Sequence, residues 1–364
     1  MADWSTLPEE LLFLIAIRLF SVVELKRFRS ICTSWRSSVL GNNDLFPNRP
    51  LIFLNQLRGI FPTQWCPVNS PFNAFLSRAA FFCVTLSSSS SQGWLIKSDV
   101  DINSGKFRLI DPLSGLAMRH LCERLDLLEF TISEIREAYQ VLDWDTRRKT
   151  SDRFKRVILV KDKRGDQRVL GICSNGNIKY WKRSQWKVKQ FAYRFSDVIV
   201  HKGLTYALDS TGTVLWVSSK LKIYRYGPPL GDNITNGCSG ERSFVECGGE
   251  LYIVDRLFGE IFRKRKGNAN FVSVETVGFK IYKFEEELGK MIEVESLGEN
   301  AFVIATDTCF SVLACEYYGC LQNSIYFKDA EEDQMKVFKL ENGSITTMSQ
   351  PSQSCFQMFV PSFL

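Results

Sequence analysis

Apolar residues follow two different patterns along the chain, helical spacing near the amino end and alternation over most of the remainder. Between residues 11 and 17, apolar side chains occupy every position, and Leu11, Ile15 and Leu19 recur at helical intervals. From Val157 onward, β-branched and aromatic residues alternate with polar ones, and glycine-containing segments separate the runs. Periods of about 3.6 and about 2 residues are the signatures of helices and of half-buried strands. The chain is therefore predicted to contain a small helical module followed by a mainly antiparallel β-domain.

The helical module is expected to contain three short helices. Thr6 with Glu9, and Ser21 with Glu24, form capping boxes, in which paired side chains satisfy the backbone donors at a helix start. A third helix is predicted from about residue 32 to 40, because the glycine and asparagines that follow favour a helix end.

The first helix carries more apolar surface than a single packed face can bury. A helix that is apolar all round must be enclosed on more than one side, and a unit of roughly 40 residues is too small to do this alone. A protein partner would cover the surplus. An ordinary helical hairpin that packs on the following domain stays an alternative, because apolar helices most often serve a core.

A secretory signal peptide is a second alternative for the same segment, and the flanking residues argue against it. Such a peptide has a basic leading region and a small-residue cleavage site. Here Asp3, Glu9 and Glu10 precede the apolar run, and Arg18 follows it. We therefore expect the segment to stay in the folded protein.

A set of motif residues runs through this module: Leu7, Pro8, Leu11, Ile15, Arg18, Leu19, Leu25, Phe28, Arg29, Ser30, Ile31, Cys32, Ser34, Trp35 and Arg36. Their order and spacing resemble the F-box. In that family three helices dock onto a Skp-type adaptor, which a cullin scaffold and a RING subunit join to form a ubiquitin ligase. By this resemblance, the adaptor surface would be formed or supported by Leu7, Pro8, Leu11, Ile15, Leu19, Leu25, Phe28, Cys32, Trp35 and Arg36.

The domain boundaries follow from the proline content. Five prolines between Pro47 and Pro71 break regular structure. We therefore divide the chain into the helical module at 1–45, a linker with irregular first strands at 46–75, and the β-domain at 76–364.

Two local features are predicted early in the β-domain. Residues 107–115 fit a strand that runs into an Asp-Pro turn closed by glycine. A helical insertion is expected near 121–140, because an apolar face appears there at helical spacing. The residues that form this face are Leu125, Leu128, Ile132, Ile135 and Tyr139.

An internal repeat supports a β-propeller. Residues 203–214 match 249–261, with the glycine, tyrosine and aspartate of each copy displaced by 46 residues (249 minus 203). Each copy is predicted to form a strand, a glycine turn and a second strand, and Asp209 and Asp255 are interpreted as turn caps. The spacing lies between the periods of two known propeller repeats. A barrel or sandwich with chance hairpin similarity stays an alternative.

Further segments of the β-domain carry a second resemblance: 109–115, 125–128, 206–209, 310–312 and 319–327. They resemble the plant F-box family that carries a KIB-type β-propeller. The two resemblances together cover nearly the whole chain. They imply an α+β multidomain fold, in which an N-terminal three-helix F-box precedes a mainly antiparallel β-propeller with a helical insertion.

Composition agrees with this division. The 364 residues are 45% hydrophobic, which is enough for a large core beyond the helical module. No apolar stretch approaches the roughly 18 to 20 residues that span a bilayer, so a soluble protein with no membrane partner is expected. The 11 cysteines include no Cys-x-x-Cys pair. Free thiols in a reducing environment are therefore predicted, with neither a disulfide framework nor a zinc ribbon.

Charge gives little further information. The net charge is +6, and basic residues gather between Arg147 and Lys189 and again at 263–266. No nucleic-acid-binding module accompanies them, so solvated loops are favoured and nucleic acid is not expected as a partner. The second cluster also fits a weak nuclear-import signal. The nucleus, the cytoplasm or both are the expected locations.

Residues suited to catalysis are sparse. The two histidines, His120 and His201, lack the three or four ligands that a metal needs, and His120 with Glu123 is a single helical turn. The carboxylate clusters at 285–287 and 331–333 are interpreted as solvated turns. We therefore expect no catalytic residues, no metal and no cofactor.

The two resemblances imply a substrate-recognition subunit of a Skp-cullin-F-box type ubiquitin ligase. The helices would dock the Skp-type adaptor, and the propeller would hold a protein target beside the charged conjugating enzyme for ubiquitylation and proteasomal degradation. The alternative is a scaffold or sequestering protein that binds a partner without ubiquitylating it. A propeller enzyme, the third possibility, would require a bound metal or small molecule.

Target contacts are expected from exposed aromatic and arginine side chains on one rim of the propeller. The residues considered for this role are Trp181, Trp186, Arg194 and Arg225, although the two tryptophans fit blade packing equally well. Neither the target's identity nor the number of blades follows from the sequence.

Overall fold

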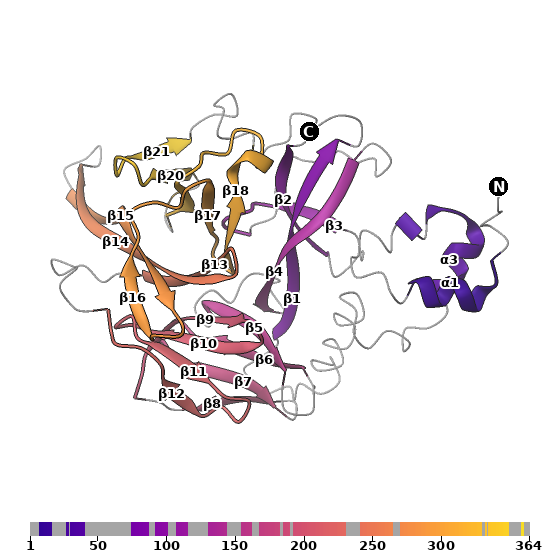
Figure 1. The fold of residues 1–364 in the computed structure, drawn as a ribbon, viewed down its shortest axis with the longest axis horizontal. Helices are drawn as coiled ribbons and strands as arrows, with labels where there is room; N and C mark the ends of the chain where they lie inside the picture. Colours follow the sequence, from indigo (N-terminus) through magenta and orange to yellow (C-terminus); the bar gives the residue numbers. More distant parts are fainter. Residues whose placement is uncertain are drawn as a thin grey trace.

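A computed structural model of the chain describes residues 7–16, 27–28, 30–40, 74–86, 92–100, 107–115, 130–143, 154–161, 167–182, 185–189, 192–230, 241–264, 270–329, 332, 334–348 and 358–359. Over these residues the protein is a mainly antiparallel β-propeller whose strands form five sheets (Figure 1). The helices lie together at one end of the long axis, to the side of the sheets.

The helical module contains α1 (Glu9–Ala16) and α3 (Thr33–Leu40). The prediction of a helix from about 32 to 40 is therefore confirmed by α3. Between the two helices, Arg27, Phe28 and Ser30 are helical, while the predicted caps at Thr6, Ser21 and Glu24 lie outside the described residues.

The five sheets are called blades 1 to 5 in chain order. Blade 1 consists of β1 (Ala74–Leu86), β2 (Gly93–Val100), β3 (Phe107–Ile110) and β4 (Phe130–Asp143). Blade 2 consists of β5 (Arg156–Lys161), β6 (Gln167–Ile172), β7 (Ile178–Lys182) and β8 (Gln185–Lys189). Blade 3 consists of β9 (Phe195–His201), β10 (Leu204–Asp209), β11 (Val214–Val217) and β12 (Ile223–Arg225).

The last two blades are larger. Blade 4 consists of β13 (Glu241–Cys247), β14 (Glu250–Lys264), β15 (Asn270–Glu285) and β16 (Lys290–Glu293). Blade 5 consists of β17 (Asn300–Ile304), β18 (Cys309–Leu313), the short helix η2 (Ala314–Glu316), β19 (Ser324–Lys328), β20 (Met335–Lys339) and β21 (Ile345–Met348). Its strands β17 and β19 pair in parallel, while the other strand pairs in the five sheets are antiparallel.

One edge strand of each blade faces the middle of the propeller. Contacts connect β4 to β5, β5 to β9, β9 to β13, and β13 to β18 in succession. Because these are the edge strands of their sheets, the five blades surround a common centre. The remaining strands of each blade lie progressively farther out.

The predicted helical insertion near 121–140 is wrong over the described residues, because 130–143 form the strand β4. Phe130 and Ile132 are buried and the residues between and after them are exposed, as in a half-buried strand. A β-bulge then leaves Ile135 without a partner in β1, opposite the step from Phe81 to Phe82. One extra residue shifts the alternation by one position, which made the apolar spacing look helical. Leu125 and Leu128 lie outside the described residues.

The repeat prediction is confirmed in its first half. The matching segments begin β10 and β14, which are second strands of the neighbouring blades 3 and 4. Asp209 caps a turn as expected, since its Oδ1 accepts hydrogen bonds from the backbone N–H groups of Thr211 (2.9 Å) and Thr213 (2.8 Å). The second half is confirmed in the first copy, where Gly212 ends a turn before β11, but it is wrong in the second copy, because Gly259 lies within β14 and not in a turn.

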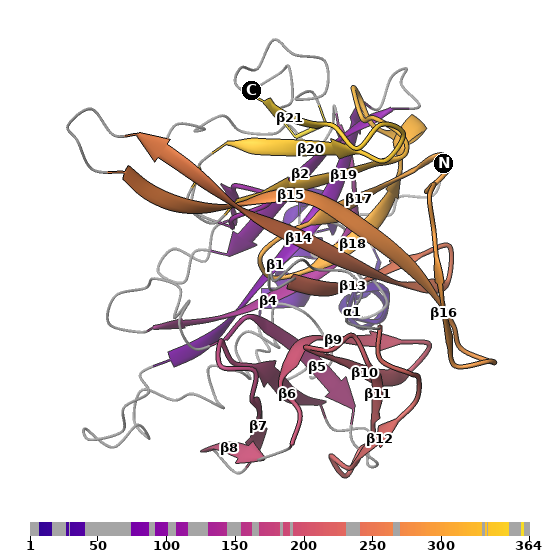
Figure 2. The same ribbon diagram turned by 90° about the vertical axis from the view of Figure 1, so that its left-hand side faces the viewer.

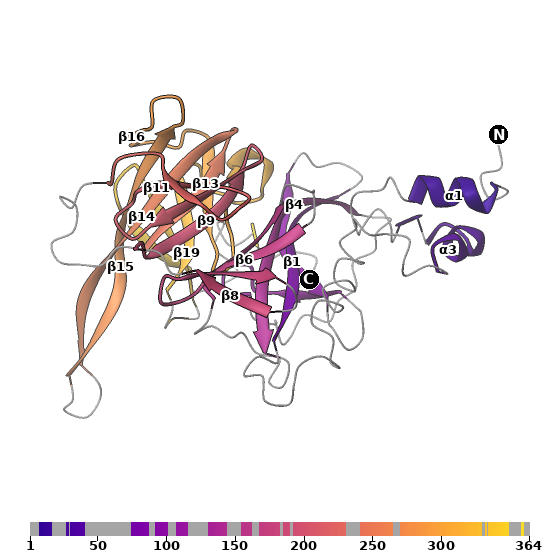
Figure 3. The same cartoon turned by 90° about the horizontal axis from the view of Figure 1, so that it is seen from below.

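Asp255 also differs from its predicted role. It is fully buried and lies 3.2 Å from the Arg242 guanidinium, so it forms an internal ion pair and does not cap a turn. Beyond it, β14 and β15 continue as one long hairpin that extends past the body of the propeller (Figure 2, Figure 3). The sequence repeat predicted the position of the strand correctly, but it did not predict this extension.

Blades 1 and 5 close the ring. Phe81 and Leu95 of blade 1 share a buried cluster with Phe310, Tyr326 and other residues of blade 5. The predicted Asp-Pro turn is confirmed beside this cluster, because Asp111 Oδ1 accepts the backbone N–H groups of residues 113 and 114 at 3.1 and 2.6 Å. The backbone N–H of Thr306 in blade 5 donates to the oxygen of Leu113 at 2.9 Å, so the two ends of the β-domain are joined by packing and by a hydrogen bond.

Candidate functional site

The helical module has a small core of its own. Leu12, Phe28 and Trp35 are buried together, and the rings of Phe28 and Trp35 lie 4.5 Å apart between centroids. Leu7, Ile15 and Cys32 pack against them while half-buried. One side of α1 is therefore occupied within the chain itself.

The other side of the module presents apolar side chains to solvent. Leu11 and Leu14 of α1 are 46% and 43% exposed, and Ile31 is 57% exposed. Leu11 and Leu14 are three residues apart, so they are neighbours on the surface of the helix. Adjacent exposed leucines on a helix that packs another side against the core are typical of a protein-binding surface.

The residues predicted to bind the adaptor have different environments. Pro8, Leu11 and Arg36 are exposed, whereas Phe28 and Trp35 are buried and can support the surface only from within. Leu7, Ile15 and Cys32 are half-buried, and Leu19 and Leu25 lie outside the described residues.

Leu14 and Ile31 are exposed apolar residues that were not among the residues predicted to bind the adaptor. The spacing of Leu14 from Leu11 was a usable signal for it. Residues three apart are neighbours on a helix surface, so Leu14 belongs beside an exposed Leu11.

Among the described residues, a hydrogen bond from Arg27 connects the module to the propeller. The Arg27 guanidinium donates through Nη2 to the backbone oxygen of Phe130 at 2.5 Å. Phe130 is the first residue of β4, so the contact is made at the end of a strand that also lines the centre of the propeller.

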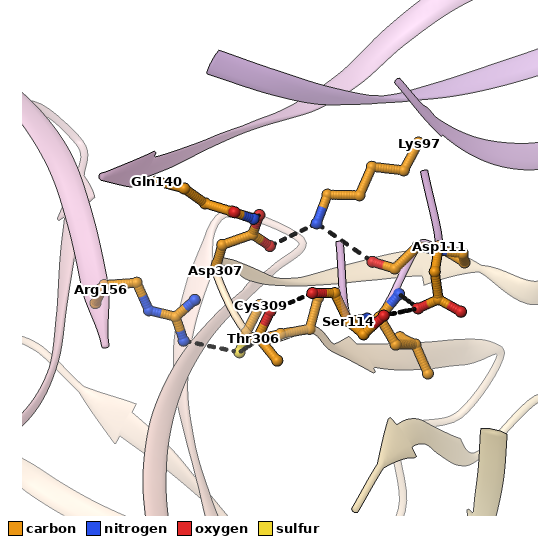
Figure 4. Close-up of polar contacts among 11 residues, drawn as sticks. Lys97, Asp111, Ser114, Gln140, Arg156, Thr306, Asp307 and Cys309 are labelled. Atoms are coloured by element: carbon orange, nitrogen blue, oxygen red, sulfur yellow. Dashed lines mark hydrogen bonds and ion pairs between the residues drawn. The ribbon is translucent and has the colours of Figure 1, made fainter. Parts of the chain in front are cut away.

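A second candidate site lies where the five blades meet. Asp307 of blade 5 accepts a hydrogen bond from the Lys97 ammonium at 2.6 Å and another from the Gln140 side-chain amide (Figure 4). Lys97 is almost completely buried, and its Nζ lies 3.4 Å from the backbone oxygen of Pro112. The pair is therefore a closed contact between blades 1 and 5.

Arg156 and Asp197 form the corresponding contact among the other blades. Arg156 Nε donates to Asp197 Oδ1 at 2.7 Å, and Asp197 Oδ2 accepts the backbone N–H of Phe244 at 2.8 Å. Arg156 Nη2 lies 3.1 Å from the Cys309 sulfur (Figure 4). Burial opposes the charge of Arg156, but Asp197 and Cys309 hold its pKa above the ordinary value. Blades 2, 3, 4 and 5 are therefore joined through one guanidinium and one carboxylate.

Arg156, Asp197, Asp307 and Cys309 line a cavity of about 340 Å³, called the central cavity. Residues of all five blades line it, from β4, β5, β9, β13 and the segment that begins β18. Polar side chains come from Arg156, Asp197 and Asp307, and apolar ones include Ile135 and Val200. Sequence reasoning missed this site because it is assembled from five distant segments. Lys97, a charged residue in the apolar run 94–97, was the one local signal.

The residues considered for target binding lie elsewhere. Arg194 and Arg225 are exposed, and Arg225 Nε donates to the backbone oxygen of Gly227 at 3.1 Å. Trp181 and Trp186 occupy paired positions on β7 and β8. Neither Arg194 nor Arg225 is among the described residues that line the central cavity.

His201 is buried between two carboxylates. Its Nδ1 lies 3.6 Å from Glu246 and its Nε2 lies 3.7 Å from Glu286. The pKa of Glu286 is lowered, because Lys202, Tyr206 and His201 outweigh the effect of its partial burial. Within the part of the chain that the structure describes, no group of three or more potential metal ligands is found. In the same part, no helix has the length and apolar character needed to cross a membrane.

The ring of five four- or five-stranded sheets, with helices beside it, defines a β-propeller protein with an attached helical module. The family model described as KIB1-4 beta-propeller matches residues 73–339, and the chain belongs to this family.

Relatives over the full length come from Arabidopsis thaliana. A protein provisionally named as an F-box protein, At1g65770, is 60% identical, with 100% of each chain covered. F-box protein At2g17690 is 47% identical over 100% of each chain, and F-box protein At4g35733 is 44% identical over 98% of each. The predicted membership of the KIB-type propeller family is thus confirmed. The full-length relatives are named F-box proteins, as the resemblance implied.

Proposed function

We propose that this protein is the substrate-recognition subunit of a Skp-cullin-F-box type E3 ubiquitin ligase. The observation that carries the proposal is the exposed pair Leu11 and Leu14, on a helix whose other face is packed against Phe28 and Trp35. A Skp-type adaptor would cover these leucines, and a cullin and a RING subunit would join through the adaptor. The names of the full-length relatives support the assignment.

In this proposal the propeller holds a target protein and the chain itself carries out no chemistry. Binding raises the local concentration of the target's lysines near the charged conjugating enzyme, which accelerates transfer without catalytic residues on the receptor. Degradation of the target would follow in the nucleus or the cytoplasm.

Co-purification tests the adaptor contact. The tagged full-length chain is expressed in plant cells, and the bound Skp-type adaptor and cullin are measured by immunoblot. We expect L11A/L14A to lose most of the adaptor, because apolar anchors at the centre of an interface dominate its affinity. The matched control is L204A/L288A, which removes two exposed leucines from the propeller and should retain the adaptor. Equal recovery from both variants contradicts the proposal.

Turnover separates ligase function from the alternative, a scaffold that binds its partner without ubiquitylating it. Proximity labelling with a proteasome inhibitor identifies proteins that accumulate beside the wild-type chain. If the protein is a ligase receptor, the same proteins are stabilised in cells that carry L11A/L14A. Unchanged half-lives of all labelled proteins favour the scaffold.

A further inference from the structure

The central cavity contains an unused hydrogen-bond donor. Arg156 is only 9% exposed, and its Nη1 makes no hydrogen bond with any group that the structure describes. Its other two guanidinium nitrogens are occupied by Asp197 and Cys309. Figure 4 shows the other terminal nitrogen of Arg156 beside the one that contacts Cys309, with no dashed line to any residue drawn. A buried donor without an acceptor is costly, so this position favours an incoming oxygen atom.

The size and lining of the cavity suit a small organic molecule. Its volume of about 340 Å³ lies at the lower end of the range for ligand sites. Apolar residues of three inner strands, including Ile158 and Ile199, line it beside the polar groups. Ile135 and Val200 are the lining residues with exposed apolar side chains, 40% and 37%, so they mark its opening.

The charges around the cavity are already balanced. Each charged residue that lines it has an oppositely charged partner within 4 Å: Arg156 with Asp197 at 2.7 Å, Asp307 with Lys97 at 2.6 Å, Glu137 with Arg78 at 2.7 Å, and Arg136 with Glu246 at 3.6 Å. An ionic ligand would enter a partly desolvated site without a free counter-charge, which is unfavourable. A neutral ligand does not meet this penalty.

We propose that the central cavity is a binding site for a small neutral molecule, which accepts a hydrogen bond from Arg156 through a carbonyl oxygen and places an apolar body toward Ile135 and Val200. The site lies within the propeller and does not depend on the adaptor contact. A receptor with such a site can be regulated by a ligand that spans all five blades.

Saturation-transfer NMR tests the proposal with three probes that share one apolar cage: 2-adamantanone, 1-adamantanecarboxylate and 1-adamantylammonium. We expect the neutral ketone to bind the full-length chain at least tenfold more tightly than either ion. Equal or tighter binding of the carboxylate overturns the charge argument, and the absence of ketone binding overturns the site.

Variants that fill the opening of the central cavity show whether the ketone binds there. V200W and I135W fill the opening from two different strands without changing the polar wall, and either should reduce ketone binding at least tenfold. The matched control V274W adds the same side chain at an exposed valine of β15, outside the cavity, and should bind like wild type. Thermal melting confirms that each variant is folded. Unchanged binding in both V200W and I135W contradicts the proposal.

Arg156→Lys tests the donor. A lysine retains a positive charge for Asp197 but lacks the second terminal N–H group of the guanidinium. We expect this variant, if its melting curve shows a folded protein, to bind the ketone at least fivefold more weakly. Wild-type affinity would show that the ketone does not contact Arg156, and the proposed binding mode would be wrong.

Discussion

The helical module and the propeller differ in how completely their neighbouring apolar side chains are buried. In the propeller, large apolar side chains such as Phe81, Phe302 and Tyr326 are completely buried between blades. In the module, three buried residues form the core, while Leu11 and Leu14 beside them stay exposed. The propeller therefore has a large core of its own beside single exposed residues such as Leu204 and Leu288, whereas the small core of the module leaves two neighbouring leucines of one helix exposed. Substitutions in the propeller core should therefore lower the stability of the protein, whereas substitutions at Leu11 and Leu14 should weaken the binding of a partner.

The largest difference is expected in stability. Phe302→Ala removes a fully buried ring from the cluster shared by blades 4 and 5, and should lower the free energy of unfolding by about 3 to 5 kcal/mol. Leu14→Ala removes an exposed side chain and should change it by less than about 0.5 kcal/mol. Urea denaturation of both variants measures the difference. Similar losses in the two proteins would show that Leu14 belongs to a core.

Buried charge is the second contrast, since every buried charged side chain among the described residues belongs to the propeller. Asp329 accepts hydrogen bonds from Arg256 Nη2 at 2.7 Å, Thr276 Oγ1 at 2.6 Å and Lys336 Nζ at 2.7 Å. Asp329→Asn removes a carboxylate that two buried cations share, while Glu332 stays 2.7 Å from Lys336 and Glu241 stays 3.7 Å from Arg256. The loss of these charged hydrogen bonds should cost about 2 kcal/mol. Lys202→Ala removes an exposed partner of Glu286 and serves as the control, with little expected change. Equal losses of stability in Asp329→Asn and Lys202→Ala would show that the buried carboxylate contributes no more than the exposed ion pair.

The same carboxyl group predicts a pH dependence. Burial raises the pKa of Asp329, but Lys336, Thr276 and Arg256 outweigh this and hold it below its ordinary value of 3.8. Because the folded-state pKa is lower than the unfolded one, this contribution to stability is complete above 3.8 and is lost as pH falls through the folded-state pKa.

Unfolding curves recorded from neutral to acidic pH test this sign. Wild-type protein should lose stability below pH 3.8 more steeply than Asp329→Asn, so the difference between the two proteins narrows as pH falls. A difference that stays constant across this window would show that Asp329 does not titrate with a lowered pKa.

The sequence predicted those features that depend on short segments. The helix α3, the Asp-Pro turn at Asp111, the turn cap at Asp209 and the propeller repeat all follow from local residue patterns. The strand β4 was misread because one bulged residue, Ile135, disturbs an alternation that is otherwise plain.

The interior sites required the structure. Arg156, Asp197 and Asp307 lie far apart in the chain, and each alone resembles a surface charge. The similar sequences that precede Asp209 and Asp255 gave no sign that one aspartate caps a turn while the other pairs with Arg242. Contacts that are distant in the sequence, such as the pairing of Asp255 with Arg242 across two strands of blade 4, decide these roles.

The central claim is that the exposed leucines of α1 serve a partner and not the fold. The most direct test measures, on purified wild type, L11A/L14A and L204A/L288A, both the affinity for a Skp-type adaptor by calorimetry and the melting temperature. We expect L11A/L14A to bind the adaptor at least a hundredfold more weakly, which is a loss of about 2.7 kcal/mol of binding free energy. Its melting temperature should stay within about 2 °C of wild type. Adaptor affinity within twofold of wild type, or a loss of binding that only accompanies unfolding, would contradict the central claim.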